Sequence, residues 1–105
     1  MSLFGWKGLP ELARDLSSDV RQAGPLFDRR VKEQYPVGMS ADALLTELKT
    51  NGFRLVGESH DERGVVRDAT FYRRRFPFAT LWSVRWRESA GKIEEIWGVY
   101  GVIGP

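Results

Sequence analysis

The last quarter of the chain predicts a β-hairpin, and this element constrains the fold more than any other. Residues 80–88 and 92–100 each alternate apolar with polar side chains over much of their length, the period that a strand requires. Ser89, Ala90 and Gly91 separate the two runs and fit a three-residue turn that ends with glycine in the left-handed conformation. Three of the four tryptophans lie on this hairpin, so its sheet must bury a large aromatic surface.

This turn sets a register for the two strands. The predicted cross-strand pairs are Glu88 with Lys92, Arg85 with Glu95, Val84 with Ile96 and Trp82 with Gly98. One face of the hairpin then carries Trp82, Val84, Trp86, Ile96 and Tyr100, and the other carries Leu81, Ile93, Trp97 and Val99. A sheet backed by one layer of helices buries only one face. The second face is therefore expected to be capped by a helix at Leu9–Val20 or to mediate self-association.

Two helical patterns open the chain. Apolar residues recur at helical spacing within Leu9–Val20, and Gly24 is expected to end that helix. Pro25 is expected to open a second helix in which Phe27–Tyr35 carries apolar residues four positions apart. Pro36 ends it, because a proline disfavours helical geometry in the residue before it.

The third helix has the clearest boundaries. Ser40 is a good N-cap and Gly52 suits a left-handed C-terminal stop. Between them Ala41, Leu44, Leu45 and Leu48 form one apolar stripe. We expect this stripe to pack on the aromatic face of the hairpin, which predicts a core of Leu44, Leu45, Leu48, Trp82, Val84 and Trp86.

Shorter strands connect the helices to the hairpin. Phe53–Val56 reads as a short strand, Glu58–Gly64 as an exposed loop and Val65–Arg73 as a second strand or strand pair. Arg74–Pro77 is expected to break it, since proline cannot donate to a central ladder. The predicted fold is α+β: N-terminal helices packed on a three- to four-stranded antiparallel sheet that ends in the Trp-rich hairpin.

Length and composition fit one domain spanning 1–105. Within it, 25–105 form the helix–helix–sheet core, and 1–24 are an extra helix or a segment altered by cloning. The formal charge of +2 is too close to balance to favour nucleic acid. The chain has no cysteine, which excludes disulfides, thiolate metal sites and cysteine nucleophiles. No apolar run has the length of a transmembrane helix.

The sequence contains no recognisable catalytic, cofactor or metal site. His60 lies among carboxylates in a predicted loop, but it has no partner at ligand spacing, and a solvated loop is the expected interpretation. Glu94 and Glu95 are adjacent on a strand and so point to opposite faces. We therefore expect no enzymatic activity and no cofactor.

A basic and aromatic segment is the main candidate for binding. Tyr72, Arg73, Arg74 and Arg75 lie together between aromatic residues. Arginine interleaved with aromatics suits base stacking, an anionic lipid surface or an acidic protein partner. The alternative is that the aromatics pack inward while the arginines are solvated or pair with Glu58, Asp61 and Glu62. Charge runs are usually solvated faces. The outer hairpin residues Leu81, Ile93, Trp97 and Val99 are the other binding candidates.

The residues from about Phe27 to Tyr100 resemble a known family. The sequence Tyr35–Ser40 leads into an amphipathic helix that ends near Asn51–Phe53, and the chain closes with the pattern Trp82-x-Val84-x-Trp86, Gly91-x-Ile93 and Ile96. This pattern resembles the SmpA/OmlA (BamE-like) envelope lipoprotein domain. The resemblance implies two helices on a three-stranded antiparallel sheet, and a non-enzymatic protein-binding role in envelope assembly or enzyme inhibition.

Two features depart from that family. The chain has no lipobox cysteine, so anchoring is not implied, and the Leu9–Val20 segment lies outside the family pattern. The hairpin is also similar to the last strands of NTF2-like folds, which imply a small-ligand-binding or enzymatic domain with a pocket lined by Trp82 and Trp86. The usual NTF2-like Asp–His arrangement has no match here.

We expect a non-enzymatic protein–protein interaction or assembly module of a bacterial-type cell envelope, with an acidic protein partner. The alternatives are the NTF2-like domain and a homodimer formed through the outer hairpin face. The compartment is left open: the resemblance implies periplasm or envelope, and Met1 as a natural start implies cytoplasm. The first residues lack the features of a signal peptide, but they also fit a cloning scar that replaces a leader.

Overall fold

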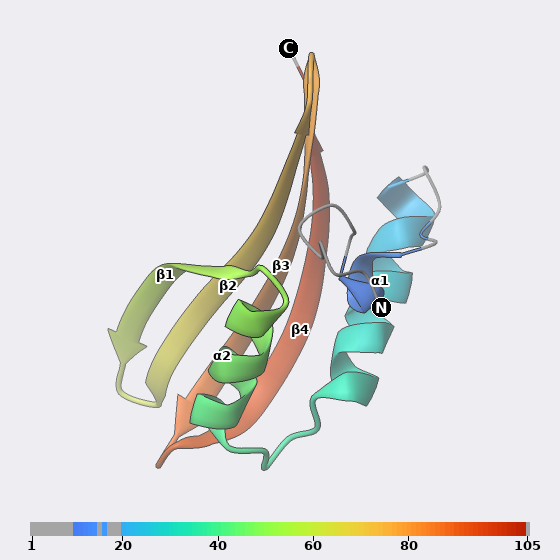
Figure 1. Ribbon diagram of the computed structural model, residues 1–105. Coiled ribbons are helices and arrows are strands. Elements are labelled where there is room, and N and C mark those ends of the chain that lie inside the picture. The colour runs from blue at the N-terminus through green and yellow to red at the C-terminus, as the bar shows by residue number, and fades with distance from the viewer. Residues whose placement is uncertain (1–9, 15, 17–19, 105) are drawn as a thin grey trace.

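The fold is two helices packed on one face of a four-stranded antiparallel sheet (Figure 1). The computed structural model describes residues 10–14, 16 and 20–104. The elements are η2 (Glu11–Ala13), α1 (Val20–Gln34), α2 (Ala41–Thr50), β1 (Arg54–Asp61), β2 (Gly64–Arg75), β3 (Phe78–Ser89) and β4 (Lys92–Ile103). The predicted α+β class is confirmed.

The sheet is a simple meander in the order β1-β2-β3-β4. The stretch Glu58–Gly64, predicted as a loop, instead forms the end of β1, a tight turn and the first residue of β2. A polar sequence can form an edge strand because its side chains stay in water while its backbone pairs. The ion pair between Arg67 Nε and Glu58, 3.0 Å apart, joins the two strands.

The predicted break at Arg74–Pro77 is smaller than expected. Arg74 and Arg75 stay in β2, paired with Ala79 and Phe78. Only Phe76 and Pro77 form the turn. The proline therefore lies outside the ladder, where it removes no interstrand hydrogen bond.

The final hairpin has a two-residue turn instead of the predicted three-residue turn. Ala90 and Gly91 both have positive φ angles, 53° and 78°, which suit a tight hairpin turn. With a register shift between Arg87 and Glu88, Val84 lies opposite Gly98, not opposite Ile96 as predicted. A shift of two residues preserves the face on which each side chain lies.

The register shift moves one predicted outer residue into the core. Ile93 was expected on the outer face, but its side chain is only 1% exposed and packs in the core cluster. A bulge places two residues opposite one, so the alternation of faces changes across it. Ile93 therefore lies in the core and not on the predicted outer face.

The N-terminal helices differ from the prediction. Glu11–Ala13 is a short 3-10 turn, and Arg14 after it is extended, so the described part of Leu9–Val20 is not one α-helix. Leu9 and residues 15 and 17–19 lie outside the described residues. Gly24 does not end a helix, since α1 starts at Val20 and runs through Gly24 and Pro25. Ala23, four positions before Phe27, is buried and extends the same stripe, so packing compensates for the proline.

The core lies between the helices and the inner sheet face. Ser40 caps α2 as predicted, accepting a hydrogen bond from the Ala43 N–H at 3.2 Å. The predicted core is confirmed for five residues, and Leu45 packs at its border. The five are Leu44, Leu48, Trp82, Val84 and Trp86.

Helix α1 lies closely against β4 at Gly98. A Cβ atom on Gly98 would come within 2.9 Å of side-chain carbons of both Phe27 and Val31. The Gly98 N–H donates a hydrogen bond to the Asp28 carboxylate on α1 at 2.9 Å. Glycine at this position therefore sets the distance between the helix and the sheet.

We expect Gly98→Ala to lower the free energy of unfolding by about 1–3 kcal/mol, because an added methyl group overpacks the helix–sheet contact. Chemical denaturation measures this change. Gly101→Ala is the matched control, since its Cβ would lie 3.6 Å from Leu81, an ordinary contact. Equal midpoints for the two variants would contradict this account of the α1 contact.

Candidate functional site

The hairpin formed by β2 and β3 projects beyond the helices as a narrow tip (Figure 1). We call Tyr72–Thr80, together with Val102 and Ile103 of β4, the hairpin tip. Its apolar side chains are unusually exposed, and Phe76 at the turn is 93% exposed. The others are Tyr72, Phe78, Val102 and Ile103, each between 44% and 51% exposed. Scattered exposed apolar residues need no explanation, whereas a group of them at one end of a sheet is a candidate for an interaction surface.

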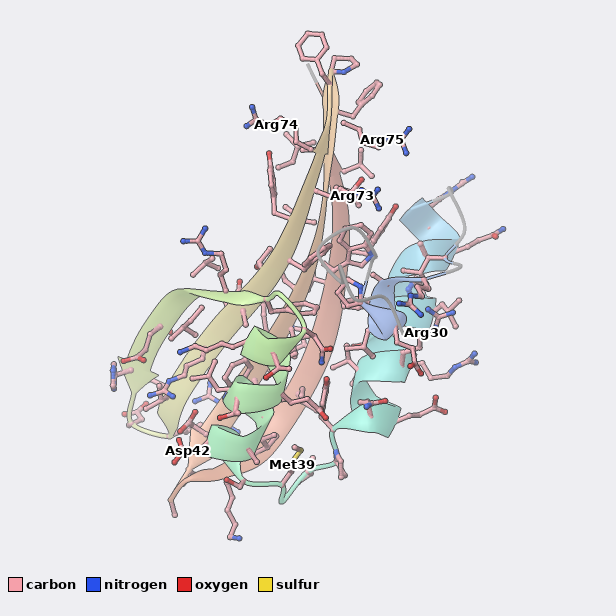
Figure 2. The ribbon with its side chains drawn as sticks, viewed as in Figure 1. Arg30, Met39, Asp42, Arg73, Arg74 and Arg75 are labelled. Carbon is pink, nitrogen blue, oxygen red and sulfur yellow. The ribbon has the colours of Figure 1, made fainter. Side chains whose placement is uncertain are left out.

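Three exposed arginines surround this apolar tip. Arg74 lies on one side of the hairpin, and Arg73 and Arg75 lie on the other (Figure 2). None of the three has an ion-pair partner among the described residues. Of the two arrangements in the alternative interpretation, the arginines are solvated and not paired, since Glu58 pairs with Arg67 and Asp61 pairs with Arg87.

Acidic residues are unevenly distributed along the length of the sheet. No acidic residue occurs between Asp68 and Glu88, and none follows Glu95. The acidic residues of the sheet therefore gather at the end away from the tip, where they pair with other arginines. Uncompensated positive charge at the tip attracts anions and steers them toward this end.

At the end of the sheet away from the tip, the charged side chains form ion pairs with one another. Arg87 Nη1 donates to both carboxylate oxygens of Asp61, at 2.7 and 2.9 Å. This hydrogen bond holds the pKa of the Asp61 carboxyl below its ordinary value and raises the pKa of Arg87. A hydrogen bond with His60, followed by the charge of Arg67, lowers the pKa of Glu58. These groups have their charge partners already, and the tip does not.

The outer sheet face is the second predicted site. Leu81, Trp97 and Val99 are half-buried and lie on the face away from the core. Arg85 Nε donates to Asp68 at 2.9 Å on the same face. Neither η2 nor α1 is placed over this face, so no described helix provides the predicted cap.

Two hollows are present in the described part of the chain. A shallow one of about 160 Å³ lies at the tip, lined by Tyr72, Arg74, Phe76 and Phe78 among others. A larger polar one of about 730 Å³ lies between η2, α1 and α2. Trp82 and Trp86 line neither of them and are 5% and 0% exposed. The predicted pocket at these tryptophans is therefore filled by packing.

Polar side chains that line the larger hollow make contacts within the protein itself. Arg30 donates to the Leu12 carbonyl at 3.1 Å and also to the Arg14 carbonyl, which ties the N-terminal segment to α1. Burial, and then the neighbouring Glu47 carboxylate, raise the pKa of the Tyr35 hydroxyl. A neutral tyrosine and an arginine engaged with backbone carbonyls make a poor catalytic pair.

His60 forms only a local contact, at 2.9 Å from the Glu58 carboxylate on the same exposed strand. Among the described residues, no group of three or more histidine or acidic side chains is arranged to hold a metal ion. No helix in the described part of the chain is long and apolar enough to cross a membrane.

Comparison of the chain with protein-family models, curated proteins and solved structures gave no match. The fold and the tip must therefore be interpreted from their own chemistry. The sequence predicted the arginines and Tyr72 but missed the exposed Val102 and Ile103. These two residues were missed because the predicted strand ended at Tyr100, whereas β4 continues to Ile103.

We expect a variant with Arg73→Gln, Arg74→Gln and Arg75→Gln to unfold at the same denaturant midpoint as the wild type. Exposed charges without partners contribute little to folding. Arg87→Gln is the contrasting variant and should lower the midpoint, because it breaks two hydrogen bonds to Asp61. A clear loss of stability in the triple variant would mean that the tip arginines hold the fold together.

Proposed function

We propose that this protein is a non-enzymatic protein-binding module, and that its hairpin tip binds an acidic partner. The observation that carries the proposal is the group of three arginines without counter-charges on a projecting apolar tip. Charge at such a site speeds the encounter with an acidic surface, and the apolar side chains add contact area once the partner has docked.

Arginine suits this role better than lysine. Its planar guanidinium group binds a carboxylate through two parallel hydrogen bonds and stacks on aromatic rings. Tyr72, Phe76 and Phe78 lie beside the arginines and supply such rings. Tyrosine and arginine are also enriched among the residues that dominate protein interfaces.

A place in a bacterial-type cell envelope belongs to the same proposal. The support is the order of elements, two helices followed by an antiparallel sheet, which agrees with the fold implied by the SmpA/OmlA resemblance. The sheet has four strands where that resemblance implies three. The natural N-terminus of the gene product tests this part, because a leader or lipobox places the protein in the envelope.

The alternative is an NTF2-like small-ligand-binding or enzymatic domain. The hollow of about 730 Å³ has the volume of a small-molecule site. This alternative has less support, because the hollow lies away from Trp82 and Trp86 and its lining is mainly polar. Small-molecule sites are lined predominantly by apolar and aromatic side chains.

A homodimer through the outer sheet face is a second proposal about assembly. Its support is the apolar group of Leu81, Trp97 and Val99 on a face that no described helix covers. We expect Trp97→Glu to convert a dimer to a monomer, because a charge at the centre of an apolar interface is costly. Sedimentation equilibrium measures the mass, with Val37→Glu, 65% exposed elsewhere, as the control. A wild-type protein that is monomeric at high concentration would end this proposal.

The main proposal is tested with a synthetic peptide of about eight residues in which glutamate and valine alternate. Fluorescence anisotropy measures its affinity at low and moderate ionic strength. We expect the triple glutamine variant of Arg73, Arg74 and Arg75 to bind at least about tenfold more weakly than the wild type. The wild-type affinity should fall as salt is added, since salt screens exposed charges.

The matched control removes the same number of positive charges elsewhere. Arg29, Lys49 and Lys92 are exposed residues away from the tip, and their triple glutamine variant has the same net charge as the test variant. It should retain wild-type affinity. Equal weakening in both triple variants would show that net charge, not the tip, determines binding.

A further inference from the structure

One edge of β2 is unpaired along the hairpin tip. β1 pairs with β2 only as far as Arg54 opposite Thr70, whereas β3 pairs with β2 as far as Phe78 opposite Arg75. Phe71–Arg75 therefore has a strand on one side and no neighbouring strand among the described residues on the other (Figure 1). Backbone N–H and C=O groups on that side can pair with another strand.

Parts of the two outer edges of the sheet are occupied or irregular. On β4, the Gly98 N–H is occupied by Asp28, and Ile93 exchanges hydrogen bonds with Gly38 and Met39 at 2.8 and 2.9 Å. The free edge of β1 contains a bulge between Leu55 and Gly57. Bulges and covering segments are the means by which proteins protect sheet edges.

The edge at Phe71–Arg75 has neither protection. Its register against β3 is continuous over all five positions, and it contains no proline. Four of these residues, Tyr72–Arg75, are exposed. The hollow at the tip is only about 160 Å³, so this surface offers little groove for a folded partner but a straight length of free backbone.

We propose that the hairpin tip binds its partner by β-strand addition, in which an extended acidic segment pairs with Phe71–Arg75 in line with β1. This inference rests on the proposed function and specifies its binding mode. Main-chain hydrogen bonds supply affinity in this mode, and alternate side chains supply specificity.

The side chains of β2 specify the pattern of the added strand. Arg73 and Arg75 share one face of the sheet, and Tyr72 and Arg74 share the other. Opposite charges on neighbouring strands stabilise a sheet, and like charges destabilise it. An added strand with acidic residues at alternate positions places them beside Arg73 and Arg75, and its other residues lie beside Tyr72.

The same arginines select against a second copy of this chain. Two copies paired along this edge would bring six guanidinium groups together, counting three from each chain. Positive residues on an open edge are a known device against edge-to-edge association. The charges therefore disfavour pairing with a second copy of the chain and favour pairing with an acidic strand. Specificity would come both from repulsion of the wrong partner and from attraction of the right one.

The experiment compares the alternating glutamate–valine peptide with two N-methylated forms. One form carries a methyl group on every glutamate amide, and the other on every valine amide. In a strand, alternate amides point to opposite edges, so each form blocks one edge only. We expect one form to bind at least about tenfold more weakly than the parent and the other to bind within about twofold.

Amide hydrogen exchange of the protein, followed by NMR, gives a second measurement. The amides of Phe71–Arg75 that face the open edge should exchange at least about tenfold more slowly in the complex, in an alternating pattern. The charge pattern has its own control. Replacing Arg73 and Arg75 with glutamine should weaken binding more than replacing Arg74 alone, because the glutamates of the peptide share one face.

The possible outcomes separate failure of strand addition from failure of the acidic-partner proposal. Salt-dependent binding that both N-methylated peptides retain, with no slowed amides, overturns strand addition and leaves the acidic-partner proposal in place. Peptide binding that is absent or indifferent to the tip arginines overturns both. Tight binding to anionic lipid vesicles without peptide binding also overturns both and assigns the tip to a membrane surface.

Discussion

The contact between α1 and β4 at Gly98 determines which surfaces of this protein are available. Phe27 and Val31 fill the space that a side chain at Gly98 would need, and Asp28 accepts the Gly98 N–H. This contact fixes α1 over the inner sheet face and occupies part of the β4 edge. The outer face and the β2 edge at Phe71–Arg75 are left without a covering element among the described residues.

The core could be predicted from the sequence because buried side chains recur at every second position of a strand. A register error of two residues leaves that pattern unchanged. The register of the final hairpin was wrong by two residues, yet Trp82, Val84 and Trp86 were still assigned to the correct face. Ile93 was assigned to the wrong face because one register shift reverses the alternation, and no composition signal marks a bulge. Face assignments therefore hold within a strand and fail across its irregularities.

Predictions failed where tertiary contacts override local preference. Glu58–Asp61 is polar enough to be a loop but is held in β1 by its pairing with β2 and by ion pairs with arginines. Pro25 marks a helix start in isolation but lies inside α1, because Ala23 packs with Phe27 on one stripe. The sequence singled out the three arginines as candidates, and the structure shows that they are exposed. Their lack of ion-pair partners among the described residues depends on where every carboxylate lies, which only the fold determines.

The tip combines two properties that a protein evolving only for stability would avoid. Exposed apolar residues such as Phe76 favour aggregation, and adjacent arginines repel one another. The arginines limit the harm of the apolar residues, because the repulsion between copies suppresses association through those residues and the open β2 edge. In the proposed binding mode, an acidic strand would neutralise the arginines and pair the free backbone of β2. On this proposal, the arginines lie beside the unpaired edge because one partner engages both the charges and the backbone.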